Sequence, residues 1–506
     1  MKQFFRFSIL LLALLLPALA TARDFEVDGI YYNINGNEAT VTSKGDYYDM
    51  YFVGYLGAVV IPPTVTYNGT TYPVTSIDEN AFYCCEGLTS IDIPNSITKI
   101  GDFAFGNCPV LTSIVVESGN PRYDSRNNCN AIIETADNTL IAGCKNTMIP
   151  NSVTSIGDRA FEGCYGLTSI VIPNSVTSIG NKAFYNCDGL TSIVIPNSVT
   201  AIGNKAFYSC DGLTSVNIPN SVTAIGNNVF ESCNELSCLV VESGNPIYDS
   251  RNNCNAIIET ADNTLIVGCK NTIIPNSVTT IGNFAFCYCW GLTSIIIPNS
   301  VTVIGKCAFE GCIGLTSVEI GNSVTSIGRY AFYSCQGLTS INIPNSVTEI
   351  GNNAFYWCTG LTSIVIPNSV TSIGNEAFMN CWMLADVYCY IADLSGVSCG
   401  NEQFYKEYNG DYSGRTLHVL QGTADAYRAD KNWYPYFGQI VDDLKPDVPG
   451  DVNGDREVNI ADVNAVINII LSGNDDNTAA DVNGDGEINI ADVNAVIDII
   501  LTGSWN

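Results

Sequence analysis

The sequence predicts a repeat solenoid followed by a small all-α domain. The first observation is a 23-residue step: variants of I-P-N-S-V-T-S-I-G-N-x-A-F-x-x-C-x-G-L-T-S-I recur through most of the chain, with clear copies near Pro150, Pro173 and Pro298. The second is a pair of nearly identical acidic segments that start at Asp451 and Asp481. Sequence periods of about 20 to 50 residues are typical of solenoids, propellers and arrays. Such a chain offers a long, regular surface and little room for a catalytic pocket.

One repeat contains a strand and a return segment. Leu167, Ile170 and Ile172 have the alternation of a strand with one face inward. The turn residues Pro173–Ser175 end that strand, and the apolar spacing over 183–187 fits a short helical turn. A single repeat cannot bury both of its faces, so we expect the core to form only when repeats stack.

The pattern L-x-x-I-x-I-P-x-x-V-x-x-I-G-x-x-A-F-x-x-C resembles the leucine-rich repeats of BspA-like bacterial surface proteins. The resemblance implies a right-handed leucine-rich-repeat solenoid over residues 75–385, with a parallel β-sheet on the concave side and a short helical or irregular convex side. Two near-copies of one insertion, near 116–149 and 241–274, each lengthen a repeat. We expect them to form strand hairpins.

The segments that flank the repeats are expected to close the solenoid. Residues 23–74 read as an N-terminal cap, with short strands at 30–34 and 70–74 that meet Asn-Gly turns. Residues 386–445 read as a C-terminal cap. Its aromatic cluster either seals the solenoid end or binds a ligand, and consists of Trp433, Tyr434, Tyr436 and Phe437.

Residues 1–22 read as a secretory signal peptide. Lys2 and Arg6 precede an apolar run over 8–16, and small residues at 18–22 offer a cleavage site. The apolar run is too short to span a membrane as a helix. We therefore expect a secreted or cell-surface protein without a transmembrane anchor.

The charge balance limits the partners. The formal net charge is −29, although charged residues make up only 14% of the chain. Such a surface repels nucleic acid and anionic membranes, and it favours cations. We expect no nucleic-acid partner.

Most of the 21 cysteines occupy one slot of the repeat, which argues against disulfides. Stacked strands are about 4.8 Å apart with parallel side chains, a poor geometry for an S–S bond. We expect a ladder of buried thiols, formed by Cys85, Cys108, Cys164, Cys187, Cys210, Cys233, Cys289, Cys312, Cys335, Cys358 and Cys381. Cys129 and Cys144 flank the first expected hairpin, and Cys254 and Cys269 flank the second. Each pair forms either a local disulfide or two free thiols.

The outward strand positions form the candidate ligand surface. They are Ser169, Val171, Ser192, Val194, Ser215, Asn217, Ser340, Asn342, Ser363 and Val365. Two interpretations remain open: small residues that tolerate a crowded sheet face, or a shallow surface that binds a protein or a glycan. A second stripe follows the Ala-Phe pair and either packs on neighbouring coils or stacks on ligands, with Tyr83, Tyr185, Tyr208, Tyr333 and Tyr356.

The C-terminal segments have the spacing of calcium loops. Residues 446–450 read as a linker to a domain at 451–506. Calcium takes about six to eight oxygens, and a 12-residue loop supplies them from positions 1, 3, 5, 7, 9 and 12. The predicted ligands of two Ca²⁺ ions are Asp451, Asn453, Asp455, the Glu457 carbonyl, Asn459 and Asp462, then Asp481, Asn483, Asp485, the Glu487 carbonyl, Asn489 and Asp492.

Aspartate at position 12, with no helix before either loop, resembles a type I dockerin. That resemblance implies calcium binding and a cohesin partner. Two departures stand out. Arg456 replaces the usual glycine at the sharp turn of the first loop, which lowers the calcium affinity expected there. Ile460-Ala461 and Ile490-Ala491 stand where hydroxyl residues are common, which weakens the implication of a cohesin partner.

The sequence favours a binding protein over an enzyme. The chain has one histidine, His418, and neither a P-loop nor an H-E-x-x-H motif. The BspA-like resemblance implies an exported, non-catalytic protein that adheres to an extracellular or cell-surface protein or glycan. The alternative is a cohesin-docked component of a polysaccharide-degrading assembly.

Overall fold

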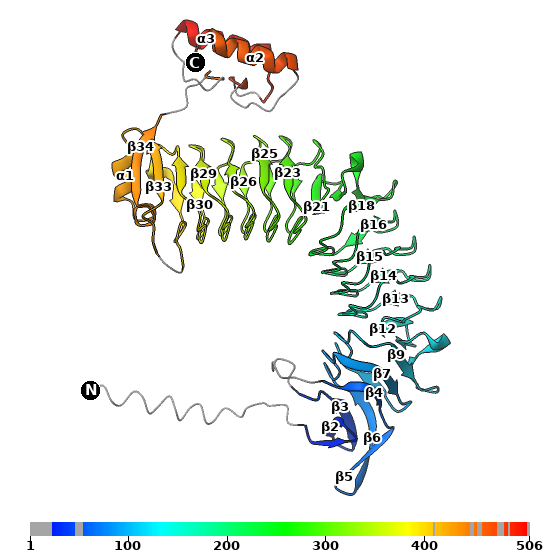
Figure 1. Cartoon of the computed structure of the whole chain (residues 1–506). Coiled ribbons are helices and arrows are strands. Elements are labelled where there is room, and N and C mark those ends of the chain that lie inside the picture. The colour runs from blue at the N-terminus through cyan, green and yellow to red at the C-terminus, as the bar shows by residue number, and fades with distance from the viewer. Residues whose placement is uncertain are drawn as a thin grey trace, which may run out of the picture. The chain divides into compact units, whose positions relative to one another are not determined.

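The computed structural model describes residues 23–45, 54–407, 410–445, 450–452, 458–472, 480–483 and 486–502. The chain divides into two compact units, residues 1–250 and 251–506. Each unit is a stack of short parallel strands joined by turns (Figure 1).

The first unit opens with two hairpins. β2 pairs with β3, and β5 pairs with β6 through the turn at Asn68 and Gly69, whose φ angles are 51° and 79°. The strands and Asn-Gly turns expected at 30–34 and 70–74 are therefore confirmed. The strands of this region are β1 (Phe25–Val27), β2 (Ile30–Asn35), β3 (Glu38–Thr42), β4 (Leu56–Val60), β5 (Thr64–Tyr67), β6 (Thr70–Ile77), β7 (Gly87–Ile93), β8 (Lys99–Ile100) and β9 (Ser113–Val116).

The remainder of the first unit begins with an insertion. There β11 pairs antiparallel with β12. The other side of β12 pairs in parallel with β13, and the parallel ladder continues through β14, β15 and β17. The elements are β10 (Tyr123–Asp124), η1 (Arg126–Asn128), β11 (Ala131–Glu134), β12 (Thr139–Gly143), β13 (Ser155–Ile156), β14 (Ser178–Ile179), β15 (Ala201–Ile202), β16 (Ser215–Ile218), β17 (Ala224–Ile225), β18 (Cys238–Val241) and β19 (Tyr248–Asp249).

The second unit repeats this plan and adds helices. Its insertion pairs β20 antiparallel with β21, and the following coils carry two parallel ladders. The elements are η2 (Arg251–Asn253), β20 (Ala256–Glu259), β21 (Thr264–Gly268), β22 (Thr280–Ile281), β23 (Ser294–Ile297), β24 (Val303–Ile304), β25 (Ser317–Ile320), β26 (Ser326–Ile327), β27 (Ser340–Asn342), β28 (Glu349–Ile350), β29 (Ser363–Ile366), β30 (Ser372–Ile373), β31 (Asp386–Cys389), η3 (Leu394–Gly396), β32 (Ser398–Cys399), β33 (Thr416–Leu420), α1 (Ala424–Ala429), η4 (Tyr434–Tyr436), β34 (Gln439–Leu444), α2 (Ile460–Ser472) and α3 (Ile490–Thr502).

Each coil contributes two strands where the sequence predicted one. β27 is the expected strand, and β28 is a two-residue strand in the return segment that pairs in parallel with β26 and β30. The rest of the return segment is irregular rather than helical. Asn353 and Trp357 have φ angles of 57° and 60°, and residues in this left-handed region break a right-handed helix.

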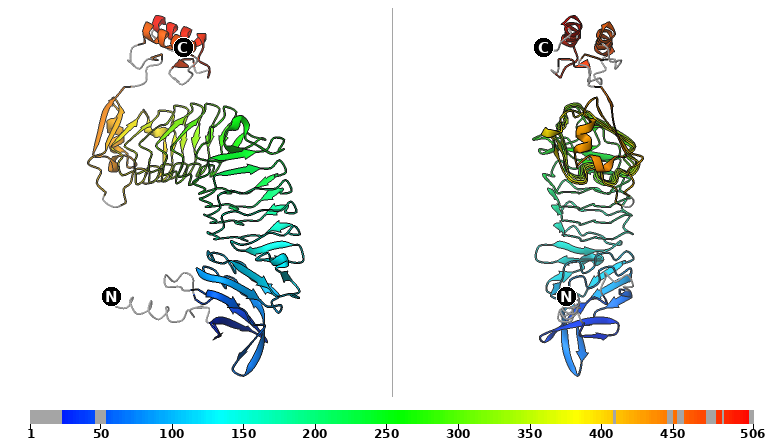
Figure 2. Two further views of the ribbon diagram at one scale, coloured as in Figure 1. Left: turned by 45° about the vertical axis from the view of Figure 1, so that its right-hand side comes forward. Right: turned by 90° about the vertical axis from the view of Figure 1, so that its left-hand side faces the viewer.

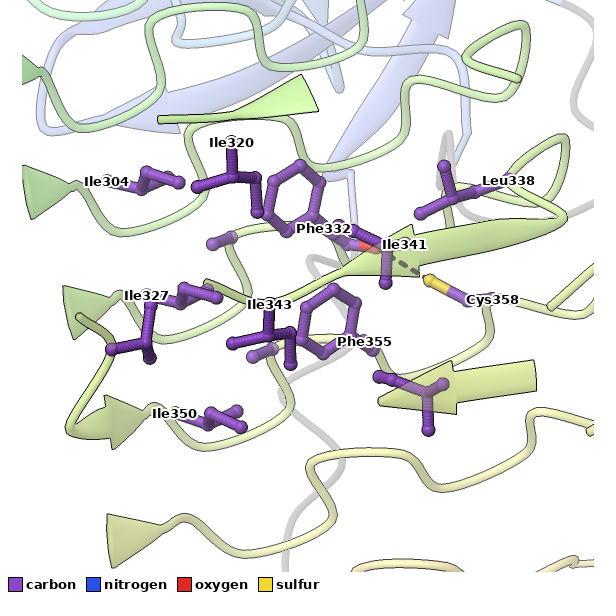
Figure 3. Close-up of a cluster of buried hydrophobic side chains, with 14 of the residues drawn as sticks. Ile304, Ile320, Ile327, Phe332, Leu338, Ile341, Ile343, Ile350, Phe355 and Cys358 are labelled. Atoms are coloured by element: carbon purple, nitrogen blue, oxygen red, sulfur yellow. Dashed lines mark hydrogen bonds between the residues drawn. The ribbon is translucent and has the colours of Figure 1, made fainter. Parts of the chain in front are cut away.

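The core is a column of identical side chains from successive coils (Figure 3). Phe332 and Phe355 are fully buried, and their rings stack with centroids 5.3 Å apart and planes 5° apart. Burial of one such side chain contributes about 1.5–3 kcal/mol. Because each ring covers the next, the column stabilises a coil only when both neighbouring coils are in place.

The cysteine slot satisfies a backbone carbonyl. Cys358 Sγ lies 3.1 Å from the Phe332 carbonyl oxygen of the preceding coil and donates its hydrogen to it (Figure 3). The same bond, at 3.0–3.2 Å, joins Cys108, Cys187, Cys210, Cys233, Cys312, Cys335 and Cys381 to Phe82, Phe161, Phe184, Phe207, Phe286, Phe309 and Phe355. The predicted ladder of buried thiols is confirmed. A thiol fits here because it fills apolar space and still offers a donor.

The cysteines of the insertions are hydrogen-bonded thiols as well. Cys129 and Cys144 are free, and Cys144 Sγ lies 3.4 Å from the Asn130 carbonyl oxygen. In the second insertion Cys269 Sγ lies 3.2 Å from the Asn255 carbonyl oxygen. The local disulfide is therefore not formed between Cys129 and Cys144.

The aromatic cluster near the end of the repeats packs against the core. Trp433 and Phe437 are buried, with ring centroids 5.5 Å and 5.1 Å from that of Phe404. Tyr434 is 59% exposed. Packing therefore accounts for the buried members of this cluster.

The thiol ladder predicts a sharp division of cysteine reactivity. Alkylation needs the thiolate, and burial raises the pKa of Cys335 well above its ordinary value. We expect iodoacetamide to label the exposed Cys238 at least roughly tenfold faster than Cys335 in the native protein, and to label both equally after denaturation. Peptide mapping by mass spectrometry measures both rates, and equal native labelling would contradict the buried ladder.

The glycine that follows isoleucine in each repeat, such as Gly351 after Ile350, lies close to the backbone of the neighbouring coil. We predict that this position requires glycine. A Cβ on Gly351 would lie 2.6 Å from the Arg329 backbone nitrogen, which cannot move aside. We expect Gly351→Ala to lower the free energy of unfolding by about 1–3 kcal/mol. Gly396→Ala is the control, since a Cβ there meets no atom within 4 Å. Chemical denaturation measures both, and equal stabilities would refute this explanation.

Candidate functional site

The C-terminal helices form a small core of their own. α2 and α3 lie side by side in both views of Figure 2 and pack against each other. Their buried side chains are Val452, Val463, Val466, Ala480, Val482, Val493 and Val496. Each helix follows one of the acidic loops directly, so the helix starts hold the ends of both loops in place.

The last residue of each loop is a buried aspartate. Asp462 and Asp492 are 0% exposed. The two carboxylate oxygens of Asp462 accept hydrogen bonds from the backbone nitrogens of Val452, at 2.8 Å, and Asn459, at 2.9 Å. Burial of a carboxylate is costly unless it is paired or binds a metal. These two carboxylates thus have the environment expected of calcium ligands.

The second loop has a further feature of a calcium loop. Gly486, at position 6, has a φ of 84° and donates its backbone N–H to Asp481 Oδ2 at 2.9 Å. Asn489, at position 9, accepts a hydrogen bond from the backbone nitrogen of Ala491 at 2.7 Å and so caps α3. Asn459 makes the same contact to Ala461 at 2.8 Å in the first loop.

The proposed ligands are only partly described by the structure. Asn453, Asp455, Glu457 and Asp485 lie outside the described residues. Among the residues that are described, no three acidic, histidine or cysteine side chains converge on one point. The donor set consists of Asp and Asn oxygens and backbone carbonyls, which suits the hard cation Ca²⁺. The twelve ligands and the two ions therefore remain a prediction.

The candidate ligand surface lies on the strand ladders of both units. In the first unit Val171 pairs in parallel with Val194, and both side chains point outward, 82% and 77% exposed. Ser169, Ser192, Ser215 and Asn217 are exposed on the same coils. In the second unit β27 pairs with β29, which sets Ser340 beside Ser363 and Asn342 beside Val365. Ser363 and Val365 are half-buried there.

The tyrosine stripe packs on itself. Tyr185 and Tyr208 stack with ring centroids 4.7 Å apart, and Tyr333 and Tyr356 stack at 5.3 Å. All four are half-buried. Each ring thus covers one face of its neighbour and leaves its edge toward solvent.

The only histidine of the chain sits between carboxylates. His418 Nδ1 lies 2.8 Å from Asp443 Oδ2, and Nε2 lies 3.3 Å from Asp386 Oδ1. The imidazole also stacks on Tyr388 with centroids 4.5 Å apart. His418 of β33 thus joins carboxylates of its two neighbouring strands, β31 and β34, in a polar cluster on the sheet.

Sequence reasoning missed one row of residues. The position after the Gly-Asn turn has a left-handed backbone in every coil and carries a different side chain from coil to coil, including Arg159, Lys182 and Lys205. The sequence did contain a signal, because the charge of the residue at this position varies from coil to coil. No role was assigned to this position from the sequence.

Comparison with known proteins identifies the same two modules. Residues 65–133, 141–255 and 267–390, more than half of the chain, match the family model described as BspA type leucine-rich repeat region. Residues 449–501 match the type I dockerin domain, a class of module that binds calcium. Both are non-catalytic binding modules with a role in protein interaction, and no enzymatic domain is detected. No curated protein matches the chain.

Several solved structures of bacterial proteins are similar to this chain. The chain is 29% identical, with a TM-score of 0.50, to a leucine-rich cell surface protein from Faecalibacterium prausnitzii, covering 74% of this chain and 97% of that one. It is 28% identical to a leucine-rich repeat protein from Bacteroides ovatus, with a TM-score of 0.41 and coverage of 83% and 100%. Pneumococcal vaccine antigen PcpA is 19% identical, with a TM-score of 0.49 and coverage of 83% and 98%.

Calcium binding by the two loops is predicted to depend on their buried aspartates. We expect calorimetric titration of the full chain to give two sites, and Asp462→Ala or Asp492→Ala each to leave one, because each removes the terminal ligand of a loop. Asp498→Ala, an exposed aspartate on α3 outside the loops, is the control and should keep both sites.

Chelation provides a second readout of the same prediction. We expect it to reduce the helical circular dichroism that arises from α2 and α3 and to lower the melting temperature of the C-terminal domain, leaving the solenoid transition in place. Two sites retained by both aspartate variants would contradict the ligand assignment.

Proposed function

Because the chain belongs to the BspA-type leucine-rich repeat family and carries a type I dockerin domain, we propose that it is an exported, non-catalytic adhesion protein. The solenoid binds a protein on a cell surface or in the extracellular matrix. The calcium-loaded tail provides a separate attachment point.

The observation that carries this proposal is a set of exposed apolar side chains on the strand face. Val171 and Val194 are more than three-quarters exposed, and Ile296 holds the same slot in the second unit at 65% exposure. Asn217 and Glu319 hold this slot in the neighbouring coils, and serine and threonine side chains flank it. Exposed apolar side chains in mainly uncharged polar surroundings are typical of protein-binding surfaces, because they gain free energy when they leave water.

The tail has its own exposed apolar positions. Ile460 and Leu471 of α2 are 67% and 78% exposed, and Ile490 and Leu501 of α3 are 68% and 76% exposed. These side chains lie at equivalent positions of the two helices. They support a docking role for the tail, and a cohesin is the partner that the dockerin domain implies.

Location outside the cell is part of the proposal. The signal-like residues 1–22 and the likeness to a bacterial cell surface protein support it. Of the helices that the structure describes, none combines the length and apolar character needed to cross a membrane.

The strand face is predicted to determine adhesion. We expect Val171→Asp/Val194→Asp to weaken binding at least roughly tenfold, because a carboxylate buried at an apolar contact loses its hydration. The measurement is solid-phase binding of the mature protein to purified extracellular-matrix proteins and to whole epithelial cells.

Two controls separate this surface from the rest of the chain. Asn174→Asp/Asn197→Asp adds the same charge at exposed turns of the same coils and should leave adhesion unchanged. A chain that lacks residues 446–506 should also adhere normally. Adhesion lost only on deletion of the tail would overturn the proposal.

A further inference from the structure

We propose that a groove beside the first insertion binds an acidic polysaccharide, a sugar polymer that carries carboxylate or sulfate groups. The groove is a cavity of about 850 Å³ within the first unit. Arg122 and Tyr123 of the insertion line one side. Arg159, Lys182 and Lys205, from three successive coils, line another.

The three cations form a continuous row. The backbone N–H of Arg159 donates to the Asn181 carbonyl at 2.8 Å, and that of Lys182 donates to the Asn204 carbonyl at 2.8 Å. Coils joined in this way place the side chains of the slot one strand spacing apart, about 4.8 Å. Like charges at that spacing repel each other, in a protein whose formal net charge is −29.

Backbone preference does not explain the choice of residue in this slot. Arg159, Lys182 and Lys205 have φ angles of 57°, 53° and 54°, in the left-handed region that asparagine tolerates better than lysine or arginine. Asn228 holds the slot in the next coil with a φ of 58°. Aromatic contacts hold the cations instead, since Arg159 lies over the Phe103 ring, 3.7 Å from its centroid, and the two lysines lie over tyrosine rings.

Two of the cations have no counter-ion in the part of the chain that the structure describes. Lys182 and Lys205 lie over the rings of Tyr185 and Tyr208, with Nζ 5.0 Å and 4.9 Å from the ring centroids. Burial and the neighbouring Arg159 lower the pKa of Lys182, and the attraction of Glu162 offsets only part of this effect. Both ammonium groups are therefore available to a negatively charged ligand.

Most of the other charges of the groove are already paired or bonded, and Asp102 adds an exposed carboxylate to its lining. Arg122 lies 2.8 Å from Glu134, and Arg159 lies 2.9 Å from Glu162. The carboxylate of Asp158 accepts a hydrogen bond of 2.6 Å from the backbone nitrogen of Asn181. The ion-paired arginines can reorient toward a ligand, whereas the two lysines need no rearrangement.

The backbone of the groove favours a polysaccharide over an acidic peptide. A peptide bound as an added strand needs unpaired main-chain groups, but the N–H groups of this row are already bonded between coils. Side chains must therefore recognise the ligand. The amides of Asn181, Asn204 and Asn227 line the groove beside the lysines. Amides suit sugar hydroxyls, and a row across coils suits a linear polymer.

The second insertion shows that the cations are specific to the first unit. Ile247 of the second insertion corresponds to Arg122 of the first. The three coils that follow the second insertion carry Phe284, Cys307 and Tyr330 at the left-handed position of the cation row. The cations nearby, Lys306 and Arg329, stand one residue earlier, in the asparagine slot. Glu310 and Glu376 line the cavity there. The same backbone thus carries a different charge pattern.

The test is binding of the full chain to polysaccharides of matched length in 150 mM salt with a chelator, which excludes calcium bridges to the acidic surface. The probes are polygalacturonate, which carries carboxylates, dextran sulfate, which carries sulfates, and neutral dextran. We expect binding to at least one acidic polymer, weaker at higher salt, and none to neutral dextran. Lys182→Asn/Lys205→Asn should reduce the affinity at least about tenfold.

Controls make the result decisive. The Lys182→Asn/Lys205→Asn variant should melt close to the wild-type temperature, because asparagine suits the left-handed slot and this offsets the lost contacts with Tyr185 and Tyr208. Lys145→Asn/Lys431→Asn removes two exposed lysines elsewhere and should bind normally. The strand-face variant Val171→Asp/Val194→Asp should also bind normally, which separates this groove from adhesion.

Three results would overturn the proposal: no binding of either acidic polymer, unchanged affinity in Lys182→Asn/Lys205→Asn, or equally tight binding of poly-L-glutamate. The last result would assign the groove to acidic peptides.

Discussion

The register of hydrogen bonds between successive coils is the constraint on which the rest of this structure depends. Gly351, for example, accepts no side chain because its Cα lies against the backbone of the preceding coil, to which its N–H donates at 2.8 Å. Extra residues are tolerated only where the chain regains this register afterwards. Ser372 pairs with Ser398, 26 residues later, and the rings of Phe378 and Phe404 still stack. The insertions regain the register by forming hairpins whose last strand, such as β12, rejoins the ladder in parallel with β13.

The buried column needs a donor for every phenylalanine carbonyl, and the thiols supply it within the coils. At the end of the repeats the pattern changes. Arg415, only 1% exposed, donates to the Phe404 carbonyl at 2.7 Å and to the Cys381 carbonyl at 3.1 Å. A buried guanidinium with several backbone acceptors takes the place of the next thiol, and the accepted hydrogen bonds compensate its lost hydration. Arg415 thus supplies the donor for the Phe404 carbonyl at this end of the column.

Residue type predicted those features that depend on side-chain burial. The long strands, the thiol ladder and the Asn-Gly hairpins followed from alternation, spacing and turn chemistry. The second ladder, such as β28, was missed because two residues are too few to show a period. The left-handed slots were missed because backbone conformation there is imposed by coil stacking, so that Arg159 and Tyr330 adopt it against their own preference. The calcium loops were predicted from spacing alone, since oxygen ligands have a fixed order along the chain, and their ligands remain a prediction.

The same stacking explains why ligand chemistry can vary in one slot without harm to the fold. At Lys182 the backbone N–H is bonded to the Asn204 carbonyl, and this bond does not depend on the side chain. The corresponding Tyr330 makes the same bond to the Asn352 carbonyl at 2.9 Å. The outward slot of the strands is more restricted, because it favours β-branched and small polar residues. A solenoid of this kind can therefore change the charge of its turn face from coil to coil while the hydrogen bonds between coils stay the same.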